Sequence, residues 1–265
     1  MTRGNPWSLD GRSAVVTGAS SGVGRAIACT LAAAGARVAC LDLDPLARDG
    51  GFDVAPELPT ADLIRRDGGD AGFFRADVSS FTAMQEAFAW ARDRYGDLHV
   101  VVNNAGTAAW GPIHEESEAE YDRVMAINAK GVWIGCKLAC AAFLSQGGGG
   151  RIVNVASVGG FIALPAEPAY CASKGAVVNL TRQIALDYGP HRIACNVVCP
   201  GPLETAMTRQ FVEDEAARAS LEAEVPWPRL GRAADIAAAV HFLSSDAAEW
   251  VTGAVLPVDG GYSAH

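Results

Sequence analysis

The chain has 265 residues, of which half are hydrophobic, and it carries a formal net charge of −9. That length can form one sizeable core, so we expect residues 1–265 to make a single domain. The acidic balance argues against nucleic acid as a partner, because phosphate recognition needs a basic face, and it also disfavours docking on anionic membranes.

Two segments bear on location. The first residues, MTRGNPWSLDG, contain no apolar stretch, which argues against a secretory signal. The longest apolar run, around residues 131–144, contains Lys137 and is too short to span a bilayer. We therefore expect a cytoplasmic protein with no membrane partner. The seven cysteines include no CxxC pair and the five histidines form no HExxH-like set, so we expect buried cysteines and no metal.

Short β-branched runs alternate along the chain with Ala-rich stretches that carry apolar residues at helical spacing. Strands that are apolar throughout and alternate with helices predict a parallel sheet covered on both faces. The predicted fold class is α/β, a single Rossmann-type doubly wound parallel sheet of about seven strands with helices on both faces. The predicted strands are residues 13–18, 37–43, 72–78, 98–103, 151–157, 192–198 and 254–259, and the predicted helices are 22–34, 80–95, 117–145, 169–188 and 233–244.

Two segments interrupt this alternation. Residues 44–71 are rich in Gly, Pro and charge, and we interpret them as a surface excursion with a short helix over 60–66. Residues 202–232 contain several prolines and an amphipathic stretch over 205–221. Because this segment follows a strand end, where open α/β sheets bind ligands, we expect it to form a substrate-binding segment within the domain.

A glycine-rich turn follows the first predicted strand. Residues 17–24 read TGASSGVG and open directly into a helix. Glycine lets the backbone approach a pyrophosphate, and the helix N-terminus offers free N–H groups and a positive dipole end. The spacing GxxxGxG differs from the GxGxxG dinucleotide fingerprint. Its place between a strand and a helix nevertheless predicts a phosphate-binding turn.

An acidic residue ends the second predicted strand. Asp42 lies 18 residues after Gly24. A carboxylate there can accept hydrogen bonds from the adenosine ribose hydroxyls and would repel a 2′-phosphate. The nearest basic residue downstream is Arg48, so the sequence favours NAD over NADP. The alternative, an Asp that only ends a strand and caps a turn, suits Asp44 better.

Tyr170 and Lys174 are four residues apart in a predicted helix, which puts both side chains on one face. A nearby ammonium is expected to lower the pKa of the phenol and make it a general acid/base. Ser157, at the end of a predicted strand, could bond a substrate oxygen beside that phenol. Asn128 is an unexpected amide within a predicted helix. The alternatives are an exposed Tyr–Lys pair and, for Asn128, a helix kink or an internal hydrogen bond.

In this order, TGxxxGxG, NNAG at 103–106, an Asn in the following helix, Ser–Tyr–xxx–Lys and PG at 200–201 resemble the compact form of the short-chain dehydrogenase/reductase family. The resemblance extends from about residue 11 to residue 262. It implies a catalytic tetrad of Asn128, Ser157, Tyr170 and Lys174, with Tyr170 as the acid/base and Ser157 polarising the substrate. Lys174 would lower the Tyr170 pKa and hold the nicotinamide ribose, and Asn128 would anchor a water.

The resemblance also implies the residues that bind the cofactor. They are the glycine turn, the ribose carboxylate, an adenine-side pair, the NNAG segment, two tetrad members and the stretch after the sixth strand. DGG at 259–261 matches the family's last strand exit. The predicted cofactor residues are Gly18, Ser20, Ser21, Gly22, Val23, Gly24, Asp42, Leu43, Asp77, Val78, Asn104, Ala105, Gly106, Tyr170, Lys174, Pro200, Gly201, Leu203 and Thr205.

The substrate pocket implied by the family is mainly apolar. This favours an uncharged, fairly hydrophobic secondary alcohol or ketone. The polar candidates near it are His114, Glu167, Glu204 and Arg209. The predicted substrate residues are Trp110, Ser157, Phe161, Leu164, Tyr170, Met207 and Phe211.

These features predict an NAD-dependent oxidoreductase that moves a hydride between a secondary alcohol or ketone and the nicotinamide. Two alternatives are an NADP-dependent 3-oxoacyl thioester reductase acting on acyl carrier protein and a non-catalytic NAD-sensing protein. The family resemblance also implies a homotetramer, in which helices 117–145 and 169–188 pack across an interface. Small residues there would allow close approach, or they could pack within the subunit: Gly131, Gly135, Ala139, Ala172 and Ala176.

Overall fold

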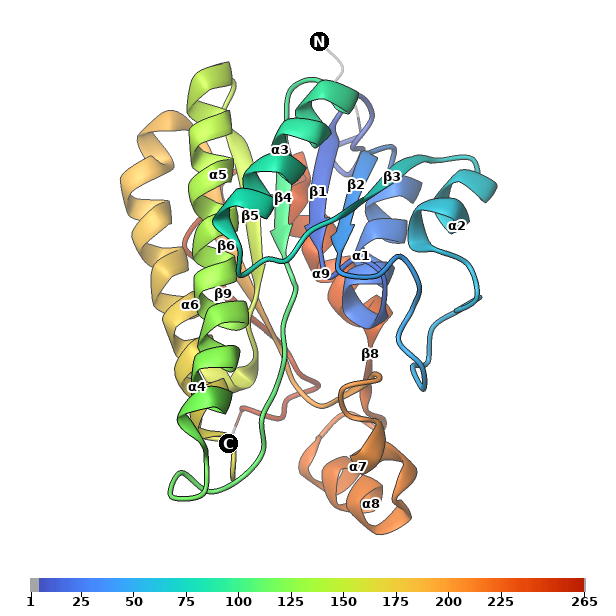
Figure 1. The fold of residues 1–265 in the computed structure, drawn as a ribbon, viewed down its shortest axis with the longest axis vertical. Coiled ribbons are helices and arrows are strands. Elements are labelled where there is room, and N and C mark those ends of the chain that lie inside the picture. The colour runs from blue at the N-terminus through green and yellow to red at the C-terminus, as the bar shows by residue number, and fades with distance from the viewer. Residues whose placement is uncertain (1–4, 265) are drawn as a thin grey trace.

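A computed structural model describes residues 5–264 and confirms the predicted α/β class. Seven parallel strands form one sheet in the order β3-β2-β1-β4-β5-β6-β9, with helices on both faces (Figure 1). The order reverses between β1 and β4, which makes that point the topological switch of the sheet. The strands are β1 Ser13–Thr17, β2 Arg37–Asp42, β3 Asp70–Arg75, β4 Val100–Asn103, β5 Gly150–Val155, β6 Ile193–Pro200 and β9 Val255–Val258.

The helices follow the predicted alternation, with additions in the two irregular segments. The short helix expected over 60–66 is present as α2, and the amphipathic stretch 205–221 becomes two helices, α7 and α8. A small two-stranded sheet joins β7 Leu203–Glu204 to β8 Gly231–Arg232. The helices are α1 Gly22–Ala33, α2 Thr60–Arg66, α3 Phe81–Tyr95, α4 Glu118–Met125, α5 Gly131–Gln146, α6 Pro168–Tyr188, α7 Arg209–Glu213, α8 Glu215–Glu224 and α9 Ala233–Ser244.

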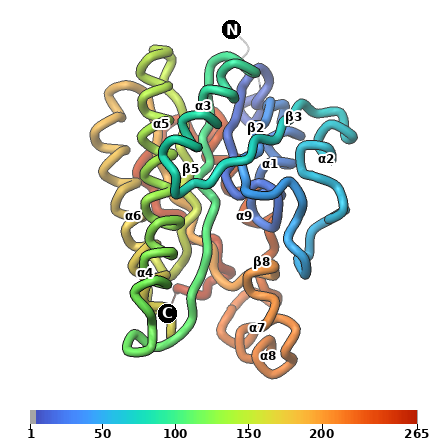
Figure 2. The backbone as a smooth tube through the Cα atoms, in the orientation of Figure 1, coloured from blue at the N-terminus to red at the C-terminus, as the bar shows by residue number. Residues whose placement is uncertain are grey.

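Each face of the sheet has its own hydrophobic core. Side chains of α3, α5 and α6 pack on one face, and those of α1, α2 and α9 pack on the other (Figure 2). The strands are buried almost throughout, as the β-branched runs predict for a sheet covered on both sides. The carboxyl ends of the strands therefore lie together at one edge, and this edge faces α7 and α8 in Figure 1.

The predicted helix 117–145 is not one regular helix. A π turn, Ala126–Lys130, separates α4 from α5. The whole segment from Glu118 to Gln146 is long and apolar enough to cross a membrane by composition, but 56% of its apolar window is buried inside the protein. The segment 118–146 is therefore long enough to span a bilayer, unlike the shorter run 131–144 considered in the sequence. Its burial shows that it packs in the core of the fold.

Three of the small residues expected at a subunit interface pack within the chain instead. A Cβ on Gly131 would meet Val78, and a Cβ on Gly135 would lie 1.9 Å from Asn103 Oδ1. Ala139 belongs to the buried core, whereas Ala172 and Ala176 are exposed. The small residues of α5 therefore allow this helix to pack closely on the sheet of the same chain.

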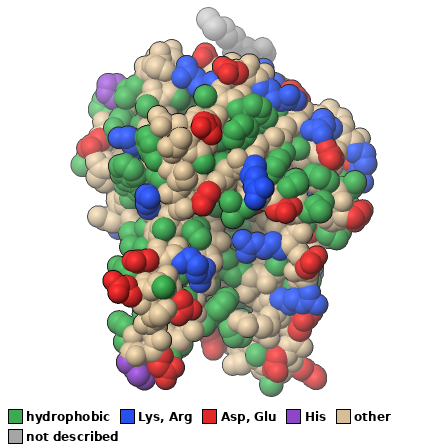
Figure 3. All heavy atoms as spheres, in the orientation of Figure 1, with side chains coloured by type: hydrophobic (Ala, Val, Ile, Leu, Met, Phe, Trp, Pro, Cys, Tyr) green, Lys and Arg blue, Asp and Glu red, His purple; other side chains and the backbone are tan. Residues whose placement is uncertain are grey.

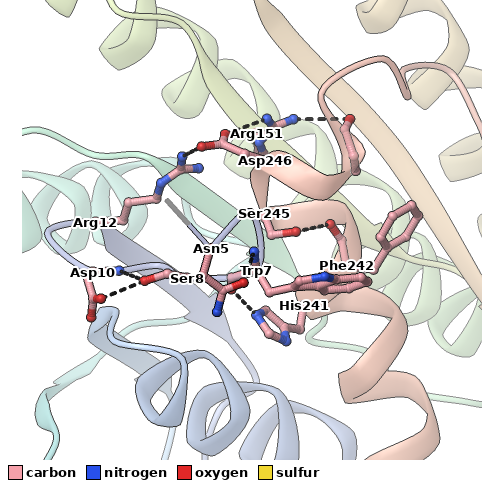
Figure 4. A network of polar contacts seen from close by, with 11 residues as sticks. Asn5, Trp7, Ser8, Asp10, Arg12, Arg151, His241, Phe242, Ser245 and Asp246 are labelled. Carbon is pink, nitrogen blue, oxygen red and sulfur yellow. Dashed lines mark hydrogen bonds and ion pairs between the residues drawn. The ribbon is translucent and has the colours of Figure 1, made fainter. Parts of the chain in front are cut away.

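A polar network ties together the amino ends of the strands, opposite the carboxyl edge (Figure 4). Asp246, just after α9, forms ion pairs with Arg12 before β1 at 2.6 Å and with Arg151 of β5 at 3.1 Å. These two arginines lower the pKa of the Asp246 carboxyl. His241 of α9 contacts the Trp7 carbonyl at 2.7 Å, so the N-terminal segment is held against this helix.

Candidate active site

The glycine turn has the shape that a phosphate-binding turn requires. Gly18 and Gly22 adopt positive φ of +64° and +54°, and a Cβ on Gly24 would lie 1.9 Å from the Gly18 carbonyl oxygen. The turn can therefore close only with glycine at these positions. Together with Ser21 and Val23, these residues line a cleft of about 290 Å³ at the carboxyl edge of the sheet. This cradle fits the pyrophosphate of a nicotinamide dinucleotide at the start of α1.

Asp42 is held firmly at the end of β2. Its Oδ2 accepts a hydrogen bond from Ser20 N at 3.0 Å, and its Oδ1 accepts one from Leu43 N at 2.8 Å. Asp42 and Leu43 both line the cleft. Ser20 does not line it, because its hydroxyl donates to the Asp44 carbonyl at 2.5 Å. Ser20 thus positions the carboxylate and the loop behind it, and its contact with the cofactor stays a prediction.

The NNAG segment joins the first and fourth strands. The Asn104 side chain donates to the carbonyls of Thr17 and Gly18 at 2.9 and 3.2 Å, and the Thr17 hydroxyl accepts from the backbone N–H groups of Asn104 and Ala105. These bonds fix the glycine turn against β4. The other predicted cofactor residues that line the same cleft are Asp77, Val78, Ala105, Gly106, Tyr170, Lys174, Pro200, Gly201, Leu203 and Thr205.

Ser157, Tyr170 and Lys174 line this cleft beside the switch point. Ser157 follows β5, and its hydroxyl accepts from Gly159 N at 3.1 Å. Lys174 is buried, and its Nζ donates to the Val155 carbonyl at 3.1 Å and lies 5.5 Å from the Tyr170 ring centroid. The sheet edge and one face of α6 therefore bring the hydroxyl, phenol and ammonium groups together.

The expectation that Lys174 lowers the Tyr170 pKa is wrong for this geometry. Burial raises the pKa of Tyr170 to about 12, although a hydrogen bond with Ser157 acts in the opposite direction. Burial also lowers the pKa of Lys174 to about 8. The ammonium lies over the ring face and on a backbone carbonyl, so desolvation decides the pKa of both groups.

Asn128 lies in the π turn and is fully buried. Its Nδ2 donates to the Thr107 carbonyl at 2.9 Å and to the Ser173 hydroxyl at 3.0 Å, and its Oδ1 accepts from Thr107 N at 2.8 Å. The internal hydrogen bonding considered as an alternative for this residue is therefore present. Asn128 does not line the cleft itself, and a Cβ on Gly106 would lie 3.5 Å from both Asn128 Oδ1 and Lys174 Nζ.

The predicted substrate residues separate into two groups. Met207 lines the cofactor cleft and a second cavity of about 470 Å³ beside it, which Trp110 also lines. Phe211 of α7 packs edge-on against Trp110 with ring centroids 5.8 Å apart. Phe161, Leu164 and Phe211 line neither cavity. Phe161 is 43% exposed, and the Leu164 side chain covers Gly159 instead.

One of the four polar candidates lies against the catalytic groups. Glu167, at the start of α6, contributes to raising the Tyr170 pKa, and burial raises the pKa of Glu167 itself despite a hydrogen bond from Trp110. Arg209 pairs with Glu213, and both line the second cavity. Glu204 pairs with Arg218 and His114 contacts Glu115, and neither Glu204 nor His114 lines either cavity.

Thr107, directly after NNAG, lines both cavities. Sequence reasoning missed two other residues of the site, Arg48 and Asp53. Arg48 also lines both cavities, although the sequence places it only as the first base after Asp42. Asp53 contacts the glycine turn across the excursion, and no local sequence signal indicated that contact. In the space-filling view, which has the orientation of Figure 1, a hollow divides the lower half of the molecule (Figure 3).

Comparison with known proteins agrees with this geometry. A family model described as Enoyl-(Acyl carrier protein) reductase matches residues 18–263. The chain is 39% identical over 256 residues to 2-(R)-hydroxypropyl-CoM dehydrogenase of Xanthobacter autotrophicus, covering 96% of this chain and 99% of the relative. It is 36% identical to D-threitol dehydrogenase of Mycolicibacterium smegmatis, covering 96% and 94%.

A solved structure shares the fold over the whole chain. This putative 2-deoxy-D-gluconate 3-dehydrogenase from Agrobacterium tumefaciens, with bound NADP, superposes with a TM-score of 0.88 at 38% identity and covers 99% of this chain and all of that one. The family resemblance read from the motifs is thereby confirmed. The chain belongs to the short-chain dehydrogenase/reductase family and is an oxidoreductase that uses a nicotinamide cofactor.

Proposed function

We propose that the protein is an NAD-dependent dehydrogenase of a small, uncharged secondary alcohol, or the reductase of the matching ketone. One observation carries the proposal: Ser157, Tyr170 and Lys174 line the same cleft as the glycine turn and Asp42. A proton-transfer group thus lies beside a dinucleotide cradle, as oxidation at a carbinol carbon requires. The nicotinamide, when bound, accepts or supplies the hydride.

The chain's own residues handle the proton and the orientation. Ser157 and Tyr170 hold the substrate oxygen between two hydroxyl groups. With its pKa raised to about 12, Tyr170 is a neutral phenol at neutral pH and is ready to donate its proton to a developing alkoxide. In the oxidative direction the phenol must lose that proton, which burial makes harder. Lys174, which lines the same cleft, would hold the nicotinamide ribose. Asn128 keeps Thr107 at the wall of the cleft.

The substrate would extend from the cleft into the neighbouring cavity of about 470 Å³. Met207 borders both cavities, and Trp110 lines the second one, with Phe211 packed edge-on against Trp110. The relatives named above are dehydrogenases of hydroxyl-bearing small molecules, which supports a substrate of this class. We place the segment 202–232 in the role of substrate binding because it supplies Met207, Arg209 and Gln210 to the second cavity.

We propose NAD as the cofactor because Asp42 is fixed at the ribose end of the cleft by two backbone N–H groups. The like charge of a 2′-phosphate would be repelled there. Against this stand Arg48, which lines the same cleft, and the NADP bound in the solved relative. Titration of both oxidised cofactors, followed by Trp fluorescence, should give tighter binding of NAD⁺. Equal or tighter binding of NADP⁺ would reverse this assignment.

The catalytic proposal is tested by Tyr170→Phe. Turnover of a panel of secondary alcohols, measured by NADH absorbance, should fall by at least about 100-fold, because a positioned acid/base contributes that much. NAD⁺ affinity should stay within about twofold of the wild type. The matched control is Tyr121→Phe, since Tyr121 is an exposed tyrosine of α4, and it should retain wild-type turnover. Persistent turnover in Tyr170→Phe would refute the proton-transfer assignment.

A second candidate is an NADP-dependent 3-oxoacyl thioester reductase. The description of the matching family model, which names an acyl carrier protein substrate, favours it. The acidic net charge of −9 disfavours it, because a carrier protein is acidic and needs a basic face. Faster reduction of a 3-oxoacyl thioester with NADPH than oxidation of any secondary alcohol with NAD⁺ would select this candidate.

We also propose a homotetrameric assembly. The exposed Ala172 and Ala176 of α6 and the exposed Trp133 of α5 leave that side of the molecule open to a second copy. Size-exclusion chromatography with light scattering should give about four times the 27.5 kDa chain mass. A species of the single-chain mass alone would exclude the tetramer.

A further inference from the structure

The loop between β2 and α2 is fastened at its downstream end. We call residues 48–58 the strap. The buried guanidinium of Arg25, on α1, donates to the carbonyls of Val54, Ala55 and Leu58 at 3.0, 2.7 and 2.8 Å and to the Thr60 hydroxyl at 3.2 Å. The three carbonyl bonds hold the strap against α1, and the fourth holds the start of α2. Figures 1 and 2 show this loop descending from β2 toward α7.

The strap places a carboxylate on the glycine turn. Asp53 Oδ1 accepts from Gly22 N at 2.9 Å, and Asp53 Oδ2 accepts from Gly22 N at 3.1 Å and from the Ser21 hydroxyl at 3.2 Å. Ser21 and Gly22 line the cofactor cleft at the start of α1. Asp53 thus binds the donors and the positive dipole end that a pyrophosphate would use.

Two anions cannot share these donors. Resting on the proposed function, we propose that Asp53 is an internal competitor of the cofactor pyrophosphate: its carboxylate closes the turn and must leave when a dinucleotide binds. Each cofactor molecule then binds only to the fraction of chains in which the turn has been released, so the contact weakens the apparent affinity.

The upstream end of the strap contains two glycines that lie against α7 and the residues before it. Gly50 has φ +74°, and it is followed by a second glycine, Gly51. A Cβ on Gly50 would lie 1.7 Å from Arg209 Nη1, so the guanidinium of α7 rests directly on the strap backbone. A Cβ on Gly51 would lie 3.7 Å from the Cβ of Ala206, so this part of the strap also lies close to the residues before α7. Release of Asp53 from the turn therefore shifts the backbone beneath α7, which carries part of the substrate cavity.

The test measures binding without turnover. Isothermal titration of Asp53→Asn with ADP-ribose should give about tenfold tighter binding than the wild type. The neutral amide keeps the shape of the side chain but loses the charge-assisted part of its bond to Gly22 N. Adenosine, which has no phosphate, should bind both proteins with the same affinity. Asp49→Asn is the matched control: it removes one charge from the exposed part of the strap and should leave ADP-ribose affinity unchanged.

Each contrary result has a distinct meaning. Unchanged or weaker ADP-ribose binding by Asp53→Asn overturns the competitor while leaving the proposed function in place. Equal tightening for adenosine, or for Asp49→Asn, also overturns it, because the effect would then be one of general charge. Absence of ADP-ribose binding by wild type and variant together overturns the proposed dinucleotide site and the competitor with it.

Discussion

Lys174 should make the protein less stable at neutral pH than an apolar side chain would in its place. The side chain is buried, and burial lowers its pKa from the ordinary 10.5 to about 8. Since the folded pKa lies below the unfolded one, the unfolded chain binds more protons between these two values. The free energy of unfolding therefore rises with pH across this window, and the cost is fully present below pH 8.

The magnitude follows from these two pKa values. Their difference corresponds to about 3 kcal/mol of destabilisation at pH 7. Lys174→Met removes this cost, but it also removes the hydrogen bond to the Val155 carbonyl, worth about 1–2 kcal/mol. We expect the variant to be about 1–2 kcal/mol more stable than the wild type at pH 7. At pH 10 about 2.5 kcal/mol of that advantage is gone, so the variant becomes the less stable protein.

The assay is urea unfolding of both proteins at pH 7 and pH 10, at one protein concentration. The control is Lys137→Met, because Lys137 lies on the exposed side of α5 and should give a stability difference that does not depend on pH. The reasoning is refuted if Lys174→Met is less stable than the wild type by the same amount at both pH values. That result would mean that Lys174 keeps an ordinary pKa in the folded protein.

Three further predictions concern other parts of the fold. Gly24→Ala should weaken NAD⁺ binding at least about tenfold in a fluorescence titration, because the added methyl group would collide with the Gly18 carbonyl. Unchanged binding would contradict the claim that the turn requires glycine at this position. Asn128→Ala should lower the free energy of unfolding by about 3 kcal/mol in urea, since three hydrogen bonds are lost; a loss below about 0.5 kcal/mol would exclude this structural role. Asp246→Asn should be less stable than the wild type near neutral pH, because the ion pair with Arg12 is lost. Arg12 lowers the Asp246 pKa, so the stability difference should shrink as pH falls from about 5 to about 2 and the carboxylate is protonated; a difference that stays constant during acid unfolding would contradict this.

Much of the fold can be predicted from the sequence because its signals are local. Apolar β-branched runs and helical spacing predict the sheet and its main helices, and the helix over 60–66 appears with those bounds as α2. Ser117 caps the start of α4, where its hydroxyl accepts from Glu120 N at 3.2 Å. The strand after the excursion was placed two residues late, since Asp70 offers no β-branched signal although it pairs with Arg37.

The remaining features depend on contacts between distant residues. Arg25 and the strap meet across about thirty positions of the chain, and no periodicity records that contact. The pKa of Tyr170 depends on how deeply tertiary packing buries the phenol, so spacing to Lys174 alone gave the wrong direction. Phe161 and Leu164 were placed in the pocket by analogy, and the course of the chain after β5 directs them elsewhere.

The π turn at Ala126–Lys130 makes helix length matter as much as residue identity. A π turn holds one residue more than the regular ladder, and each residue rotates a helix by about 100°. The α5 side of the turn is oriented by the sheet, whereas the α4 side is oriented by Val124, which packs on Ala109 and Ala169. The extra residue lets α4 and α5 each keep the rotation about the helix axis that its own neighbours require. Deleting a single position there would turn one half away from its neighbours, so this segment tolerates substitutions better than changes of length.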